Sequence, residues 1–233
     1  MPARKGAKIV GALVVVAALA AVGSSFAGAQ SDDTRRGTDP LSGDEQSAAV
    51  DEAGAASGGG TESAGANGLP ERLVLLVERH EEAKDADPAM RRADVYEYSY
   101  RDDTLTTSVV DLDSGRVDET TSGQGTQLPL VEVESARARD LLFADQEFTG
   151  RLAVEFEAAT GRPLDDPSAD LLVQPIVFRA DSMPVVARGA AAECGVKRCA
   201  QFLIQSTDHL LINLFPLVDL SDGVVLTADG VAQ

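Results

Sequence analysis

Apolar residues recur along the chain with two different periods, which predict a mixture of helices and strands. Between Leu69 and His80 they return every three or four residues, the spacing of one helical face, and Asp87-Pro88 supplies a stop. From Arg92 to Arg101 apolar and polar residues alternate, as they do in a half-buried strand. We therefore expect a first helix that is followed directly by a sheet.

Two turns divide this expected sheet into three strands. Asp102-Asp103 separates the first strand from a β-branched run over Thr104–Leu112, and Asp113-Ser114-Gly115 precedes a third strand at residues 116–121. The alternation places three tyrosines of the first strand on one face: Tyr96, Tyr98 and Tyr100. This stripe is a candidate binding face, but one side of a packed sheet explains it better.

The second half of the sequence repeats the order of helix and sheet. Pro129 opens an expected helix with Glu132 and Glu134 near its positive end, and a second apolar stripe, Phe148, Leu152, Phe156 and Ala159, marks a helix that ends at Gly161. Four strands should follow, at residues 171–180, 199–206, 210–220 and 223–227. The first of them is expected at an edge because Pro175 cannot donate to a ladder.

An internal sequence similarity supports a fold of two units. Val109–Val117 aligns without gaps with Leu217–Val225, and both segments contain Val-Asp-Leu followed by a glycine turn. The predicted fold class is α+β, with two small helix-on-antiparallel-sheet units at residues 69–127 and 128–233. Chance similarity is the alternative explanation, because Val, Asp and Gly are abundant in this chain.

The N-terminus has the layout of a secretory signal peptide. Arg4, Lys5 and Lys8 precede an apolar run, and the small residues Ala27 and Ala29 favour cleavage after Ala29. The alternative is an uncleaved anchor, because residues 9–29 would span about 30 Å as a helix. We expect a secreted or extracytoplasmic protein, with the membrane-anchored form as the alternative.

Residues 30–68 have the composition of a spacer. They are rich in Ser, Gly, Ala, Asp and Glu, and only Leu41 and Val50 are large aliphatic residues. Such a segment cannot offset the chain entropy of folding, which predicts a disordered linker. A fold induced by a partner is the alternative.

Charge and residue counts exclude several functions. The chain has 38 acidic and 20 basic residues and a net charge of −18, which disfavours nucleic acid and anionic membranes as partners. Membrane contact is expected only through the N-terminal segment, if that segment is retained. With two histidines and two cysteines, a three-histidine centre and a four-cysteine zinc or iron–sulfur site are both ruled out. No metal or other cofactor is predicted.

The remaining candidate sites favour structural roles. Cys194 and Cys199 are expected to form a disulfide across a tight loop, since the pair lies in an exported chain and is not Cys-x-x-Cys. Asp111-x-Asp113-x-Gly115 resembles the start of a calcium loop, but its twelfth position is Ser122, so a hairpin turn is favoured. His80 is interpreted as a partly buried helix-face residue, and His209, in a turn without a nearby cysteine or histidine, as a surface residue. Ser182 and Ser206 lack the glycine pattern of a nucleophile elbow, so the sequence does not support a hydrolase triad.

Three short motifs resemble the small N-terminal domains of copper amine oxidases: Arg92-Ala93-Asp94-Val95, Val109-Val110-Asp111-Leu112 with Gly115-Arg116-Val117, and Leu128-Pro129-Leu130 followed by Glu132 and Glu134. Pro216–Leu220 ends the second unit in a similar way, so the resemblance covers residues 90–226. It implies two cystatin-like modules, equivalent to the domains called N2 and N3, each with a helix packed on an antiparallel sheet. In that family these modules are accessory to a much larger catalytic domain.

The departures from the family concern its chemistry. Amine oxidation requires three histidines on copper and a tyrosine that follows an asparagine, whereas this chain has two histidines and no Asn-Tyr pair. The resemblance therefore implies fold and not activity. We expect an exported, non-catalytic protein-interaction or structural module at the cell envelope, with an unknown protein partner. The alternatives are an extracellular enzyme or its accessory subunit, and a modulator or inhibitor of secreted enzymes.

Overall fold

A computed structural model describes residues 39–57, 65, 67–81, 90–180, 186–187, 189–210, 212–226 and 231–232. The fold is α+β, as predicted, and contains two four-stranded antiparallel sheets. The expected signal segment, with Ala27 and Ala29, lies outside the described residues. In the described part of the chain, no helix has the length and apolar character needed to cross a bilayer.

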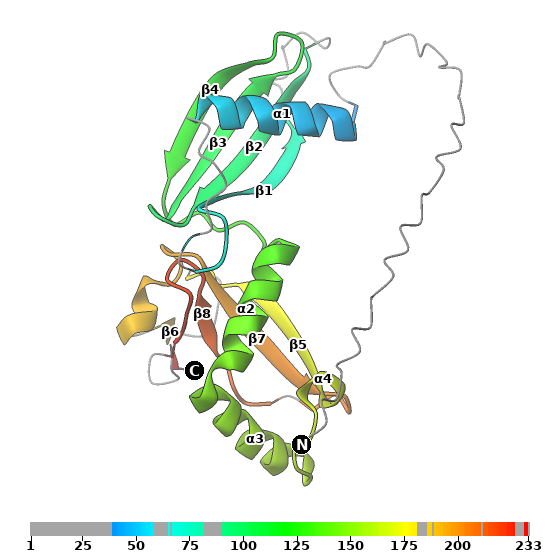
Figure 1. Ribbon diagram of the computed structural model, residues 1–233, viewed down its shortest axis with the longest axis vertical. Helices are drawn as coiled ribbons and strands as arrows, with labels where there is room; N and C mark the ends of the chain where they lie inside the picture. Colours follow the sequence, from blue (N-terminus) through cyan, green and yellow to red (C-terminus); the bar gives the residue numbers. More distant parts are fainter. Residues whose placement is uncertain are drawn as a thin grey trace, which may run out of the picture. The chain divides into compact units, whose positions relative to one another are not determined.

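The first sheet consists of four consecutive strands in the order β1-β2-β3-β4: β1 Arg72–Arg79, β2 Arg92–Ser99, β3 Thr104–Asp111 and β4 Arg116–Gly123. Helix α1, Gly43–Ala56, lies across one face of this sheet (Figure 1). Ala49 and Ala53 of the helix are buried against Ala93, Val95 and Val110 of the sheet. The hairpin predicted from residues 92–112 is confirmed by the pairing of β2 with β3.

The prediction of a helix over residues 69–80 is wrong, because this segment forms the edge strand β1. A bulge between Val74 and Leu76 explains the misleading period. Leu73 lies opposite Tyr98 and Leu76 opposite Tyr96, so two leucines three residues apart share one face of the sheet. Bulged strands and helices can therefore show the same local spacing of apolar residues.

The prediction of disorder is wrong for residues 43–56, which form α1. Ser42 caps the helix by accepting the N–H of Glu45 at 3.3 Å, and the Glu45 carboxylate accepts the N–H of Ser42 at 2.7 Å. Ala49 and Ala53 are the buried residues of the helix, and they are small. The small alanine side chains let the helix lie close to the sheet. Leu41 and Val50, the two large aliphatic residues of the segment, pack against the same cluster, so few large apolar residues are needed.

The second sheet has the order β5-β7-β8-β9, with β5 Leu171–Val177, β7 Cys199–Ser206, β8 Leu217–Asp219 and β9 Val224–Leu226. The helices of this half of the chain are α2 Glu132–Ala144, α3 Gln146–Thr160 and α4 Pro167–Asp170. A short helix η1, Gly189–Glu193, follows the paired strand β6 Val186–Ala187, whose partner is β10 Val231–Ala232. Gly161 ends α3 in the left-handed conformation, as predicted, and the strand expected at 210–220 is shortened to β8.

Pro175 lies on an edge strand, as predicted. The N–H of Phe178 donates to Cys199 and the N–H of Thr207 donates to Asp170, which makes these residues hydrogen-bonded pairs of the β5–β7 ladder. Because such pairs alternate along an antiparallel ladder, Pro175 occupies a non-hydrogen-bonded position with its nitrogen toward the free edge. The ladder therefore loses no hydrogen bond, and the edge lacks one donor for a further strand.

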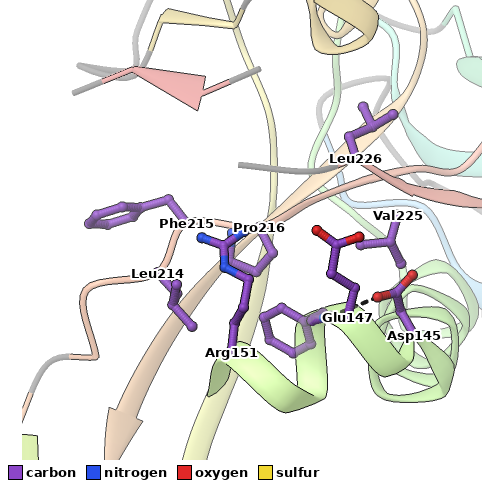
Figure 2. Close-up of a pocket in the computed structure, with 9 residues that line it drawn as sticks. Asp145, Glu147, Arg151, Leu214, Phe215, Pro216, Val225 and Leu226 are labelled. Atoms are coloured by element: carbon purple, nitrogen blue, oxygen red, sulfur yellow. Dashed lines mark hydrogen bonds between the residues drawn. The ribbon is translucent and has the colours of Figure 1, made fainter. Parts of the chain in front are cut away.

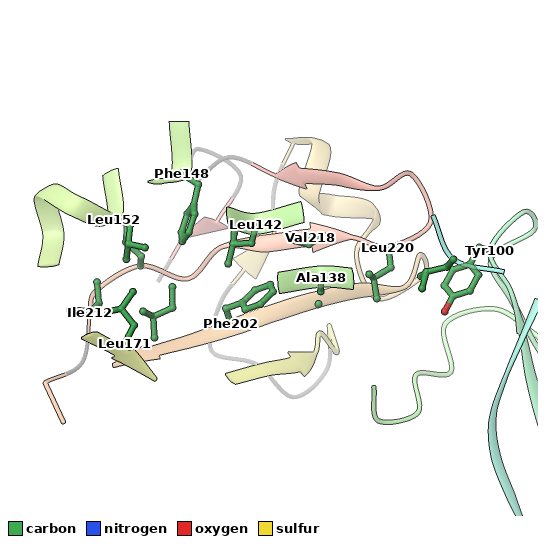
Figure 3. Packing of buried hydrophobic residues seen from close by; sticks show 14 of the residues in the cluster. Tyr100, Ala138, Leu142, Phe148, Leu152, Leu171, Phe202, Ile212, Val218 and Leu220 are labelled. Atoms are coloured by element: carbon green, nitrogen blue, oxygen red, sulfur yellow. The ribbon is translucent and has the colours of Figure 1, made fainter. Parts of the chain in front are cut away.

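The largest apolar core lies between α2, α3 and the second sheet and continues to the end of β2 (Figure 3). Phe202 and Ile204 of β7 are fully buried with Leu142 of α2 and Leu152 of α3. Tyr98 and Tyr100 belong to the same cluster, and their rings meet edge to face at 5.2 Å. The tyrosine stripe is thus largely a packed surface, as the sequence favoured.

The two similar segments, Val109–Val117 and Leu217–Val225, form the same type of β-hairpin. In each, the N–H of a glycine in the left-handed conformation donates to an aspartate carbonyl four residues earlier at 2.9 Å, Gly115 to Asp111 and Gly223 to Asp219. Each aspartate carboxylate also accepts two backbone N–H groups of its own turn. These N–H groups lower the pKa of Asp111, whereas burial raises the pKa of Asp219. The Asp111 motif is therefore a hairpin turn.

Candidate interaction face

A fully buried ion pair joins α2 to the second sheet. The Arg198 guanidinium donates to both carboxylate oxygens of Glu134, the Nη2···Oε2 distance being 2.8 Å. It also donates to the carbonyls of Leu128 at 2.9 Å and Pro129 at 3.0 Å. Both side chains are completely inaccessible to solvent. A buried charge pair is tolerated when all its polar atoms find partners, and here they do.

Two tyrosines of the first sheet complete this cluster. The Tyr100 hydroxyl donates to Glu134 at 2.7 Å, and the Arg198 guanidinium lies 5.4 Å from the ring centroid of Tyr98. Burial, with the Glu134 carboxylate as a second cause, raises the pKa of Tyr100. Tyr100 therefore remains a neutral hydrogen-bond donor, and the cluster serves to hold chain segments together.

A second pair has the same layout on the first sheet. Arg91 Nε donates to Glu45 Oε1 at 2.8 Å, and its Nη2 donates to the carbonyl of Pro40 at 2.8 Å. The hydrogen bond from Arg91 lowers the pKa of Glu45 to about 2. Glu45 and Glu134 are each the third residue of a helix, and each arginine directly precedes a strand. Sequence reasoning missed both pairs, although Ser42-x-x-Glu45 is a capping-box motif that could have indicated α1.

The predicted disulfide between Cys194 and Cys199 is present, with an S–S distance of 2.06 Å. It closes the loop that carries Arg198. The side-chain amide of Gln127 donates to the carbonyls of Gly195 and Val196 in this loop, each at 3.2 Å. The disulfide and Gln127 together hold the loop in the conformation that brings Arg198 to Glu134.

The other sequence candidates are placed apart from any common site. His80 follows β1 and lies with its Nδ1 2.7 Å from Asp94 Oδ1; its side chain is partly buried, as predicted, but it is not on a helix. His209 is exposed in a turn with φ +63°. Ser206 is buried and accepts the N–H of Leu210 at 3.1 Å, and Ser182 lies outside the described residues. Among the residues with described positions, no three His, Cys, Asp or Glu side chains are grouped to hold a metal ion.

Among the described residues on the α2–α3 side, two hollows are considered as candidate sites. The first, at the N-terminus of α3, has a volume of about 30 Å³, and Arg151, Leu214 and Pro216 are among its lining residues (Figure 2). This is room for about one or two water molecules. The second is an open groove of about 670 Å³, and Phe143, Asp166 and Leu171 are among its lining residues. The hydrogen bond from the Ser168 hydroxyl lowers the pKa of Asp166, as expected for an ordinary ionised cap.

The face of the first sheet opposite α1 is more distinctive. Its row of Leu73, Tyr98 and Leu105 belongs to the large core, with Tyr98 and Leu105 buried, and we call the part of the face beyond this row the open face. Strand alternation and register place two cross-strand rows on it: Leu76, Tyr96, Thr107 and Thr121, and Glu78, Asp94, Val109 and Glu119. Leu76 is 38% exposed, and Thr121, Glu78 and Glu119 are also exposed. The open face therefore presents Leu76 and Tyr96 beside a row that carries three carboxylates. The register places Arg92 and Arg116 in the row beyond these carboxylates.

Tyr96 connects the two rows. Its hydroxyl donates to Glu78 Oε1 at 2.9 Å. Partial burial, this hydrogen bond and the charges of Glu78, Asp94 and Glu81 raise the pKa of Tyr96 to about 12. The Tyr96 hydroxyl is thus a neutral hydrogen-bond donor beside carboxylates.

Comparison with known proteins gives a fold likeness and no family. No protein-family model matches the chain, and no curated protein sequence matches it. The solved structure of a copper-containing benzylamine oxidase from Hansenula polymorpha superposes on 81% of the chain with a TM-score of 0.50 and 12% sequence identity. The likeness is one of fold. The chain spans 29% of the length of that oxidase. The likeness in fold is weakly consistent with the resemblance of the sequence to amine oxidase domains.

Proposed function

We propose that this chain is an exported, non-catalytic protein-interaction module of the cell envelope and that the open face is its contact surface. The observation that carries the proposal is the exposure of Leu76 beside Tyr96 on a four-stranded face whose opposite side is covered by α1. Aromatic residues, tyrosine among them, are enriched at surfaces that bind other proteins.

The use of the buried charged groups supports a non-catalytic role. Glu134 and Arg198 neutralise each other, and Arg91 is paired with Glu45. Each pair holds a helix to a sheet with carbonyl acceptors around the guanidinium. Groups engaged in this way are poorly suited to exchange protons with a substrate, because breaking either pair would leave a buried charge.

Site-specific photo-crosslinking in the cells that produce the protein tests the contact surface. A photoreactive residue replaces Thr121, which is exposed on the open face, or, as the matched control, Glu157, which is exposed on α3. The proposal predicts a crosslinked protein in the envelope fraction from position 121 and none from position 157. Equal crosslinking at the two positions, or none from position 121, contradicts it.

Export is tested separately by N-terminal sequencing of the protein recovered outside the cytoplasm. Cleavage after Ala29 predicts Gln30 as the first residue. An intact N-terminus in the membrane fraction would assign residues 9–29 as an anchor, and recovery of the intact chain in the cytoplasm contradicts export.

The fold likeness favours a second candidate, an accessory part of an extracellular oxidase with units equivalent to the N2 and N3 domains of amine oxidases. Here the crosslinked partner would itself carry copper and stain for a protein-bound quinone. A partner without either contradicts this candidate and leaves the interaction module in place. Stoichiometric copper and quinone in the purified chain alone would contradict both.

A further inference from the structure

The chain contains two asparagines, and one of them, Asn67, is followed by a glycine. An Asn-Gly pair deamidates in water without an enzyme, because the backbone nitrogen of the glycine attacks the side-chain carbonyl carbon of the asparagine. Glycine favours this attack, since it has no Cβ to restrict the backbone. The other asparagine, Asn213, precedes the bulky Leu214. Asn67 is therefore the asparagine whose local sequence favours deamidation.

Hydrogen bonds hold both reacting nitrogens of this pair in the folded chain. The N–H of Gly68, the nucleophile, donates to the carbonyl of Gly65 at 3.0 Å. The side-chain nitrogen of Asn67, the leaving group, donates to the carbonyl of Leu220 at 2.7 Å. Asn67 is only 4% exposed, so water and hydroxide have little access to it. Its Oδ1 accepts the N–H of Leu69 at 3.0 Å, which would favour attack, so protection depends on the other two bonds and on burial.

The same residue joins two distant parts of the chain. Asn67 precedes β1 of the first sheet, whereas Leu220 follows β8 of the second sheet, 153 residues away. Arg137 of α2 also holds this segment, because its Nε donates to the carbonyl of Asn67 at 2.6 Å. Gly68 has a φ of +79°, and a Cβ at this position would lie 3.0 Å from Cζ of Arg137. The Asn67-Gly68 segment is therefore packed against both α2 and the turn after β8.

We propose that Asn67-Gly68 is a modification site, at which deamidation is blocked while Asn67 is docked on Leu220 and proceeds when the segment opens. In the open segment, the Gly68 nitrogen loses its proton to hydroxide and bonds to Cγ of Asn67. The Cγ–Nδ2 bond breaks, and ammonia leaves with a proton taken from water. A second water molecule then opens the succinimide ring at either carbonyl, which leaves aspartate or isoaspartate at position 67.

Neither product can restore the original contact. A carboxylate has no N–H to donate to the carbonyl of Leu220, and two acceptors would face each other at a buried position. Isoaspartate also adds a methylene to the main chain beside Gly68, where Arg137 packs closely. The modification is therefore a one-way step that releases the segment before β1 from the second sheet.

Mass spectrometry of the full chain at mildly alkaline pH tests the blocked state. Deamidation at Asn67 is followed in native buffer and in denaturing urea, with Asn213 as the internal control. In urea, Asn67 should react faster than Asn213. In native buffer, Asn67 should react at least about 100-fold more slowly than in urea, because its rate follows the small open fraction of the segment. Similar rates for Asn67 in the two conditions overturn the proposal.

Two variants of α2 test whether the docked segment controls the rate. Arg137→Ala removes the donor to the Asn67 carbonyl and the packing on Gly68, whereas Arg139, the matched control, lies 3.4 Å from the exposed Glu132. In the folded chain, we expect deamidation to be about tenfold faster in Arg137→Ala and less than twofold faster in Arg139→Ala. Equal rates in the two variants contradict the proposal. Thermal melting verifies folding, and Arg137→Lys, which lacks the Nε donor, replaces Arg137→Ala if that variant does not fold.

The deamidated chain tests the one-way release. Its additional negative charge allows separation from the intact chain by anion exchange. We expect it to unfold at a lower urea concentration than the intact chain, and Asn67→Asp to behave in the same way. Asn213→Asp makes the same change in charge at an exposed position and should leave the midpoint unchanged. Equal midpoints for Asn67→Asp and Asn213→Asp would refute the loss of a docking contact.

Discussion

Arg91 and Arg198 occupy equivalent positions in two successive helix-on-sheet units. The carbonyl of Arg91 accepts the N–H of Leu112 at 2.9 Å, and the carbonyl of Arg198 accepts the N–H of Leu220 at 2.8 Å. Each guanidinium pairs with the glutamate at the third position of its helix and with a proline carbonyl before that helix. With the repeated hairpin, this correspondence indicates that the two units share one construction, in which a helix N-terminus is bound to a sheet by an ion pair.

The complete burial of the Arg198–Glu134 pair predicts a large loss of stability in Glu134→Gln. The change leaves the buried Arg198 charge without its counter-ion, and we expect the free energy of unfolding to fall by about 3–5 kcal/mol. Chemical denaturation measures it. Glu132→Gln is the matched control: Glu132 is 89% exposed and 3.4 Å from Arg139, and its loss should stay below about 0.5 kcal/mol. Similar losses in the two variants would contradict a structural role for the buried pair.

The Arg91–Glu45 pair predicts a pH dependence of stability through Glu45. Its pKa in the folded chain is about 2, against an ordinary value of 4.5. A depressed pKa means that the stabilisation is fully present above about pH 4.5 and is lost as the pH falls toward 2. We expect Glu45→Gln to cost about 1–2 kcal/mol at pH 7, and this difference from the natural chain should shrink below pH 4.5. Urea denaturation at a series of pH values measures it, and a difference that is constant with pH would refute the assignment.

The disulfide predicts a smaller, entropic contribution. Opening the six-residue loop from Cys194 to Cys199 by the double change Cys194→Ser/Cys199→Ser should lower the free energy of unfolding by about 2 kcal/mol. The same loss is expected when the natural chain is denatured in the presence of a reductant, and the double variant should not respond to the reductant. A reductant effect on the variant would show that the loss has another source.

The two hairpin glycines predict unequal costs for the same substitution. Both have positive φ, +63° at Gly115 and +69° at Gly223, so alanine is strained at each and should cost about 1 kcal/mol. At Gly223 the new Cβ would also lie 3.1 Å from Cα of Asn67, whereas at Gly115 its nearest neighbour is the flexible end of Glu52 at 3.4 Å. Thermal unfolding should rank Gly223→Ala as more damaging than Gly115→Ala, and the reverse order would contradict this packing.

Local patterns were sufficient wherever the cause of a structure lies within a few residues. The alternation at residues 92–112, the turn at Gly115, the end of α3 at Gly161 and the short disulfide loop were all predicted correctly, because sterics and turn chemistry act at short range. The same local view failed at residues 72–79, where a bulge gives a helical spacing of apolar residues, and at residues 43–56, where the buried residues are alanines.

The sequence by itself determined the α+β class, the repeated hairpin and the disulfide. Tertiary structure alone decided that Arg198 meets Glu134 across 64 residues, that Arg91 meets Glu45 across 46, and that Leu76 and Glu119 share the open face. Contacts of this kind depend on strand register and on the desolvation of paired charges, which arise only when distant segments pack together.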